Sequence, residues 1–161
     1  NASIVYAVDR WESKDKIESW LKKGYIVIAN RYVSANQIHQ GGKITNSKKR
    51  NNFMKWLDQM EYEVFGIPRP NITLYLSLPM NIVLQLLKDR ESSKMKRAYL
   101  KKKKDVHEMD VNFLINSRKS ALKLVKEIPN FIKIECSEKG EILSREQVHK
   151  MVYEKVKKII K

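Results

Sequence analysis

Three short, apolar-rich runs alternate with helix-like segments along this chain of 161 residues. The runs cover Tyr25–Ala29, Ile72–Leu78 and Phe131–Glu135. The first is almost wholly apolar, which is typical of a strand covered on both faces in a parallel sheet. Strands that alternate with helices predict an α/β fold with right-handed crossovers. Ligands in such folds bind beyond the carboxyl ends of the strands, so the polar residues that follow these runs are the first candidates for a site.

The segments between the runs carry apolar side chains at the spacing of an amphipathic helix. Ser13 is a potential N-cap, Gly24 suits the position after a helix, and Ser144–Gln147 has the pattern of a capping box. We expect helices over residues 13–23, 51–65, 79–87 and 108–127, and a last helix that begins after Ser144. Residues 91–107 are very basic and poorly periodic, which predicts a mobile loop or a marginal helix.

Composition excludes several classes of protein. A hydrophobic share of 42% is too high for a disordered chain, and 161 residues suffice for one domain with its own core. No apolar run approaches the roughly 20 residues of a membrane-spanning helix. The only cysteine, Cys136, excludes a disulfide scaffold and a cysteine-based zinc site, and the first residues do not form a signal peptide.

The formal net charge of +15 favours partners that carry phosphate. These include nucleic acid, nucleotides and an anionic membrane surface. A lysine-rich surface that is simply solvated explains the charge equally well.

The densest polar cluster, Asn30–Gly42, directly follows the first apolar run. Arg31 is costly to desolvate there unless it meets an anion, and its guanidinium suits a phosphate. The amides of Asn36, Gln37 and Gln40 can both donate to and accept from a base edge. The glycine pair that ends the cluster permits a tight turn or a close approach of the backbone. The alternative is a polar loop that only caps a helix.

Two further segments can carry chemistry. Tyr6 and Arg10 are neighbours on one face if their segment is helical, and a ring with a guanidinium can grip an aromatic base. Alternatively, Tyr6 is a core residue and Arg10 pairs with Asp9 or Glu12. The basic run Lys94–Asp105 can close over a polyphosphate, although a solvated charge run or a nucleic-acid tail has the same composition.

Together, these segments resemble the thymidylate kinases, the P-loop enzymes that phosphorylate dTMP. Tyr6–Glu12 matches an aromatic-x-x-x-Arg segment, and Ile28–Gln40 is similar to a strand that ends in Asp-Arg-Tyr/His and leads into the base-binding helix. Phe65–Leu76 resembles the family's Pro-x-Pro approach to the next strand. The resemblance covers nearly the whole chain, and it implies a P-loop NTPase-like three-layer fold in which helices flank a parallel sheet.

The resemblance implies a dTMP site. Tyr6 would stack on thymine, Arg10 would reach the base edge, and Arg31 would hold the phosphate. Asn36 would lie near N3 and O4 of the base. Four further positions would complete the site: Gln37 and Gln40 on the same helix, His39 near the deoxyribose, and His107.

The resemblance also implies residues that contact ATP, here called the ATP side of the site. Residues 90–107 match the LID, the basic segment that closes over ATP, with Arg90, Lys94, Lys96 and Arg97 as candidate phosphate contacts. Arg31, Lys96 and Arg97 are the catalytic candidates. The loop that begins at Cys136 and Ser137 matches the one that touches adenine.

Two departures from the family pattern matter. The family's aspartate before the arginine is Asn30 here, so this residue would hold Mg²⁺ only weakly, through a water molecule. The sequence also contains no Gly-x-x-x-x-Gly-Lys-Ser/Thr motif. We therefore expect the 161 residues to be one partial domain that lacks the family's initial strand, P-loop and helix, and to be inactive alone.

The function implied for the full-length gene product is ATP- and Mg²⁺-dependent phosphorylation of dTMP to dTDP. A cytoplasmic homodimer without membrane association is expected. Two other classes remain open: another nucleoside or nucleotide kinase, and a non-catalytic basic module that binds nucleic acid.

Overall fold

The structure is a computed structural model that describes residues 2–95 and 111–160, and the side chains from residue 90 to residue 95 lie outside this description. The chain forms two compact units. The first, here called the N-unit, comprises Asn1–Asn71 and Asn116–Ala121. The second, the C-unit, comprises Ile72–Ile115 and Leu122–Lys161.

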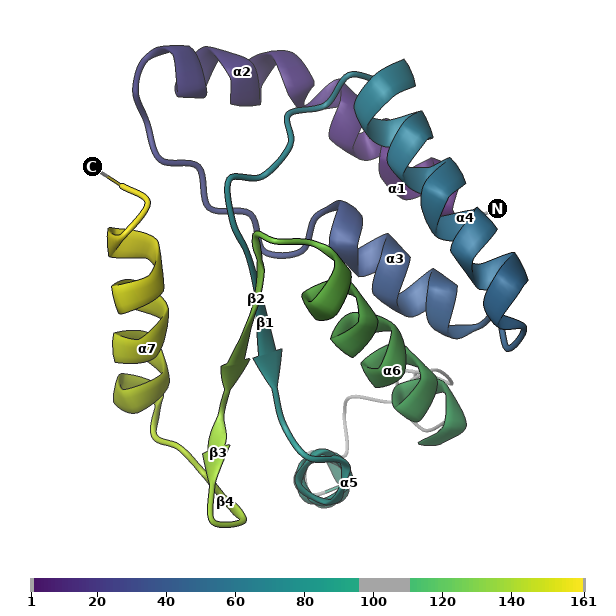
Figure 1. The fold of residues 1–161 in the computed structure, drawn as a ribbon. Helices are drawn as coiled ribbons and strands as arrows, with labels where there is room; N and C mark the ends of the chain where they lie inside the picture. Colours follow the sequence, from purple (N-terminus) through teal and green to yellow (C-terminus); the bar gives the residue numbers. More distant parts are fainter. Residues whose placement is uncertain (1, 96–110, 161) are drawn as a thin grey trace. The chain divides into compact units, whose positions relative to one another are not determined.

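In the N-unit, helices pack around a small apolar core. Its elements are α1 (Ala2–Glu12), α2 (Lys14–Lys22), α3 (Val33–Gly42), α4 (Ser47–Asp58) and the π-helix η1 (Gln59–Val64). Both α1 and α4 contact α3, as Figure 1 shows. The core side chains are Ala7, Val33, Met54, Leu57, Ile67 and Ala121.

The C-unit contains the parallel strand pair that the sequence predicts. β1 (Thr73–Ser77) and β2 (Phe131–Glu135) run parallel, with Thr73 opposite Phe131 and Ser77 opposite Glu135. The other elements of this unit are α5 (Met80–Met95), the hairpin of β3 (Ser137–Glu138) and β4 (Glu141–Ile142), and α7 (Arg145–Lys157). Helix α7 contacts β2. The long helix α6 (Val111–Glu127) contributes residues to both units.

Several local predictions are confirmed. The Ser144 hydroxyl accepts from the Gln147 N–H while the Gln147 side chain accepts from the Ser144 N–H, which is a complete capping box at the start of α7. Gly24 follows α2 with a φ of +79°, which suits glycine. Ser13 precedes α2, but its side chain makes no capping hydrogen bond.

The prediction of a strand over Tyr25–Ala29 is wrong. This run is irregular, and Ile28 is 90% exposed while Tyr25 and Ile26 are each 61% exposed. A strand requires a hydrogen-bonded neighbour, and within the described residues no strand pairs with this run. The prediction of a strand covered on both faces therefore fails, because composition alone cannot supply the partner that makes a strand.

Three element boundaries also differ from the prediction. The helix expected over 51–65 begins earlier, at Ser47, and ends as the π-helix η1. The helix expected to end near Leu87 continues to Met95, so the described part of the basic segment, residues 91–95, is helical, which is one of the two structures expected for it. An i,i+4 hydrogen bond of 3.1 Å from Gln85 to Asp89 supports this extension. The loop after β2 contains the hairpin β3–β4, which the sequence did not predict.

Candidate functional site

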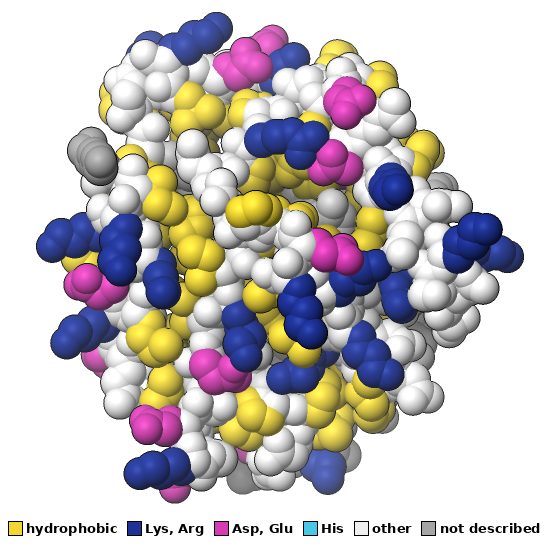
Figure 2. Space-filling model, viewed as in Figure 1, with side chains coloured by type: hydrophobic (Ala, Val, Ile, Leu, Met, Phe, Trp, Pro, Cys, Tyr) yellow, Lys and Arg dark blue, Asp and Glu magenta, His cyan; other side chains and the backbone are white. Residues whose placement is uncertain are grey.

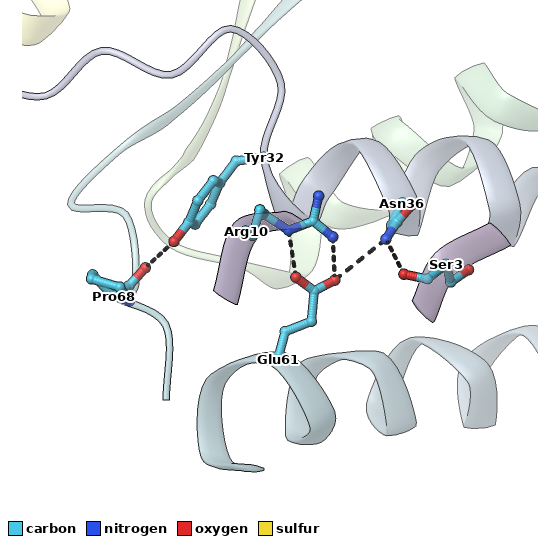
Figure 3. Close-up of polar contacts among 6 residues, drawn as sticks. All are labelled: Ser3, Arg10, Tyr32, Asn36, Glu61 and Pro68. Carbon is cyan, nitrogen blue, oxygen red and sulfur yellow. Dashed lines mark hydrogen bonds and ion pairs between the residues drawn. The ribbon is translucent and has the colours of Figure 1, made fainter. Parts of the chain in front are cut away.

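The N-unit contains a buried ion pair that links two distant segments. Arg10 of α1 donates to Glu61 of η1 from Nε at 2.5 Å and from Nη2 at 2.6 Å (Figure 3). The Glu61 side chain is 0% exposed and that of Arg10 is 14% exposed. A carboxylate in this position is tolerated only because it is paired and hydrogen bonded. Arg10 therefore pairs with a residue 51 positions away rather than with Asp9 or Glu12.

Asn36 of α3 joins the same carboxylate. Its Nδ2 donates to the Ser3 carbonyl oxygen at 3.1 Å and to Glu61 Oε1 at 3.4 Å. Glu61 thus connects α1, α3 and η1 through one side chain (Figure 3). Glu61 lies inside the π-helix η1, a rare kind of element that is frequent at functional sites.

Tyr6 lies one helical turn before Arg10 on α1, so the condition under which the two residues share a helix face, a helical segment, is met. Its side chain is 54% exposed, so the alternative in which Tyr6 is a core residue is wrong. The neighbouring Ala7 is fully buried and anchors this helix in the core. An exposed ring one helical turn from a guanidinium that Glu61 holds in place offers two groups suited to an aromatic base.

Arg31 precedes α3 with an unusual backbone conformation. Its φ is +71°, in the left-handed region that non-glycine residues rarely adopt, and the residue is exposed. The next residue, Tyr32, is the N-cap of α3, and its hydroxyl donates to the Pro68 carbonyl oxygen at 3.0 Å. Burial raises the pKa of this tyrosine. The N-terminal N–H groups of α3 and the Arg31 guanidinium both favour an anion here.

The remaining amides lie along α3. Gln37 is buried beside Asn36, whereas Gln40 is half-buried. The close approach predicted for the glycine pair is found at Gly42, where an added Cβ would lie 2.8 Å from Ser117 Oγ and 2.9 Å from the Ser117 backbone nitrogen. This contact fixes the end of α3 against residue 117 of α6.

His39, also on α3, is half-buried and has a lowered pKa. Burial is the main cause, and the positive charges of Arg31 and Lys43 add to it. The unfolded chain therefore binds a proton at this histidine more readily than the folded chain. The contribution of neutral His39 to the free energy of unfolding is complete above the ordinary histidine pKa of about 6.5 and is lost as the pH falls below it.

We expect His39→Gln to remove part of this acid sensitivity. In urea unfolding at pH 7.5 and pH 5.5, the loss of stability on acidification should be smaller in the variant than in the native protein. His149→Gln, a change at an exposed position of α7, is the matched control and should leave the pH dependence as it is. Equal acid sensitivity in the native and His39→Gln proteins would contradict the assignment.

The residues present do not form a magnesium site by themselves. Asn30 is exposed and offers one neutral amide oxygen, whereas Mg²⁺ prefers carboxylate and phosphate oxygens. Over residues 2–95 and 111–160, no group of three His, Cys, Asp or Glu side chains is arranged to hold a metal ion.

The candidates for an ATP side fall in or near the C-unit. Arg90 and Lys94 belong to α5, but their side chains are not described, and Lys96 and Arg97 lie outside the described residues. The dTMP candidate His107 lies outside them as well. Cys136 is buried directly after β2, which raises the pKa of its thiol, and Ser137 begins the hairpin. The C-unit also has an apolar pocket of about 420 Å³ beside α7, lined mainly by Leu76, Leu78, Cys136, Leu143, Val148 and Val152.

Figure 2 shows how the charged side chains are distributed over one face of the molecule. In the face drawn in Figure 2, lysine and arginine side chains lie among apolar and acidic ones. Within the described part of the chain, no helix is long and apolar enough to cross a membrane. The charge alone therefore does not identify a partner, and the case for a nucleotide rests on the site residues.

Sequence reasoning missed Glu61. A signal was present, because Glu61 lies four residues after Leu57 and seven after Met54, on the buried face of an amphipathic segment. An acidic residue at such a position must find a buried donor. Only the structure shows that the donors come from α1 and α3.

The parallel strand pair and the helices between its strands define an α/β protein, and the site in the N-unit presents an aromatic ring, arginine and amide groups. The family model described as Thymidylate kinase matches residues 1–152. The chain therefore belongs to the thymidylate kinase family.

Curated relatives agree with this family. The chain is similar to a "Probable thymidylate kinase" of Pyrobaculum aerophilum, with 27% identity over 89 residues, which are 55% of this chain and 41% of that protein. It is also similar to a "Thymidylate kinase" of Marinomonas sp., with 30% identity over 79 residues, or 49% of this chain and 34% of that protein. The matched stretches thus span less than half the length of either relative.

Proposed function

We propose that the full-length gene product is a kinase that transfers the γ-phosphoryl group of ATP to dTMP, which gives dTDP and ADP. The observation that carries the proposal is the group of Tyr6, Arg10 and Asn36, which combines a ring for stacking with hydrogen-bonding groups for a base edge. The family membership and the names of the two relatives agree with a nucleotide kinase.

In this proposal the N-unit binds dTMP. The exposed ring of Tyr6 stacks on thymine, and the guanidinium of Arg10 donates to O4. Asn36 faces N3 and O4, and Gln37 and Gln40 extend the same face of α3. His39 would lie near the deoxyribose, and His107 is assigned to the dTMP site without a more specific contact.

Arg31 holds the 5′-phosphate of dTMP at the N-terminus of α3. Its conformation supports this role, because a strained and exposed arginine gives the folded protein no evident benefit of its own. A guanidinium grips a phosphate with two parallel hydrogen bonds and so fixes the acceptor oxygen for in-line attack.

The LID-like segment 90–107 supplies positive charge to the transferring phosphoryl group, chiefly from Lys96 and Arg97 and also from Arg90 and Lys94. Phosphoryl transfer depends on positioning and on charge stabilisation, which such a segment provides. Cys136 and Ser137 contact the adenine of ATP. The 161 residues contain no P-loop motif, and in this proposal the loop that cradles the triphosphate and its Mg²⁺ is a further part of the full-length gene product.

Ligand-induced stabilisation tests the acceptor assignment. We expect dTMP to raise the melting temperature of the full-length gene product in a concentration-dependent way, with a gain in the free energy of unfolding of about 2.7 kcal/mol when free dTMP is a hundredfold above Kd. dUMP should act more weakly, and dGMP and thymidine should have little effect. Steeply salt-dependent binding of DNA or RNA without any response to dTMP would contradict the proposal and favour the nucleic-acid-binding class.

The protein is also proposed to form a homodimer through α4 and η1. Trp56 is 40% exposed on α4, and Met60 is half-buried on η1, so an apolar surface is available on this side of the N-unit.

A further inference from the structure

The Glu61 carboxylate accepts hydrogen bonds from Arg10 and Asn36, and both of these side chains are proposed to contact the base. Its Oε2 accepts from Arg10 Nε at 2.5 Å. Its Oε1 accepts from Arg10 Nη2 at 2.6 Å and from Asn36 Nδ2 at 3.4 Å. Since the Glu61 side chain has no exposed surface, no water competes for these contacts from the Glu61 side. The carboxylate thus determines how both side chains are presented.

The orientation of Arg10 follows from the contacts of its guanidinium. One edge, formed by Nε and Nη2, faces Glu61. The remaining nitrogen, Nη1, lies on the far side of the planar group and points away from Glu61 in Figure 3. Because arginine carries only donors, this free end is a fixed hydrogen-bond donor.

The side-chain amide of Asn36 is also held in one orientation, but it is left with an acceptor, whereas Arg10 is left with a donor. Its Nδ2 lies between two acceptors, the Glu61 carboxylate and the Ser3 carbonyl oxygen. A flipped amide would place Oδ1 against both oxygens, which is repulsive. The amide is therefore held with Oδ1 directed away from Glu61, as a fixed hydrogen-bond acceptor.

We propose that Glu61 is the positioning residue that makes this site specific for a 4-oxo pyrimidine. The inference rests on the proposed function. Thymine and uracil present an acceptor at O4 and a donor at N3, which complement the donor of Arg10 and the acceptor of Asn36. Cytosine presents a donor at its 4-amino group and an acceptor at N3, so both of its edge groups oppose the fixed pair.

The inference is tested with dTMP and 5-methyl-dCMP, which differ only in this donor–acceptor edge. Kd values for both are measured by calorimetry on the full-length gene product, as the native protein and as Glu61→Gln. Glutamine has one amide oxygen where the carboxylate has two acceptor oxygens. The side chain at position 61 therefore loses its hydrogen bond to Arg10 or to Asn36. We expect the ratio of Kd for 5-methyl-dCMP to Kd for dTMP to fall by at least about tenfold in the variant.

The matched control is Glu63→Gln, which makes the same chemical change at an exposed position of η1 and should leave the ratio unchanged. If Glu61→Gln does not fold cooperatively, Glu61→Asp replaces it. The shorter side chain keeps the charge for Arg10 but withdraws from Asn36, whose contact is already the longest at 3.4 Å. The ratio should fall in this variant too.

The outcomes separate the two proposals. A native protein that does not bind dTMP overturns the proposed function and this inference with it. If the native protein binds dTMP but the variants raise the Kd values of both ligands by the same factor, the proposed function stands and the inference is overturned. A purely structural role of Glu61 would change both affinities alike.

Discussion

Arg31→Gly is expected to weaken dTMP binding by about a hundredfold or more while it stabilises the fold. The loss follows from removing two charge-assisted hydrogen bonds to the phosphate. The gain follows from the φ of +71°, which costs a side chain about 1 kcal/mol and glycine almost nothing. Calorimetry with dTMP and urea unfolding of the full-length gene product measure the two effects.

Lys139→Gly is the matched control for this experiment. Lys139 is the other described non-glycine residue with a positive φ, at +50° in the turn between β3 and β4. The change should relieve strain in the same way and leave dTMP affinity unaltered. Arg31→Ala should also strongly reduce turnover of dTMP, with little change in the free energy of unfolding. Native-like turnover of dTMP by either Arg31 variant would remove the phosphate-binding role.

Gly42→Ala is expected to destabilise the protein by about 2–3 kcal/mol, because the new methyl group has no room. Its Cβ would lie 3.0 Å from Ser117 Cα and closer still to Ser117 N and Oγ, so the backbones of α3 and α6 would have to separate there. The cost should exceed the gain of about 1 kcal/mol that alanine brings to a helix. Urea unfolding of the full-length gene product gives the change in free energy.

Gly41→Ala provides the comparison, since it makes the same change one residue earlier on the same helix. The nearest atom to its new Cβ is Met54 Cε at 3.2 Å, the end of a flexible side chain that can move aside. This variant should be close to neutral or slightly stabilising. If both variants lose equal stability, the close approach of α3 to residue 117 is not the cause.

Local chemistry made several elements predictable from the sequence. The capping box at Ser144 depends on residues close together in the chain, and the apolar pattern of Phe131–Glu135 predicted a strand that does find a neighbour, β1. The apolar run Tyr25–Ala29 failed as a strand because strand formation is a pairing, and the pattern of one segment contains no information about its neighbour.

The same distinction between local pattern and contact with distant segments applies to the candidate site. The sequence by itself determined which groups are available: the ring and guanidinium four residues apart on α1, the amides of α3 and the arginine before it. Only the tertiary structure decided that Glu61, 51 residues from Arg10, is their common partner. The physical reason is that helical spacing brings together residues of one turn, whereas a buried carboxylate is satisfied by donors that arrive from other elements through packing.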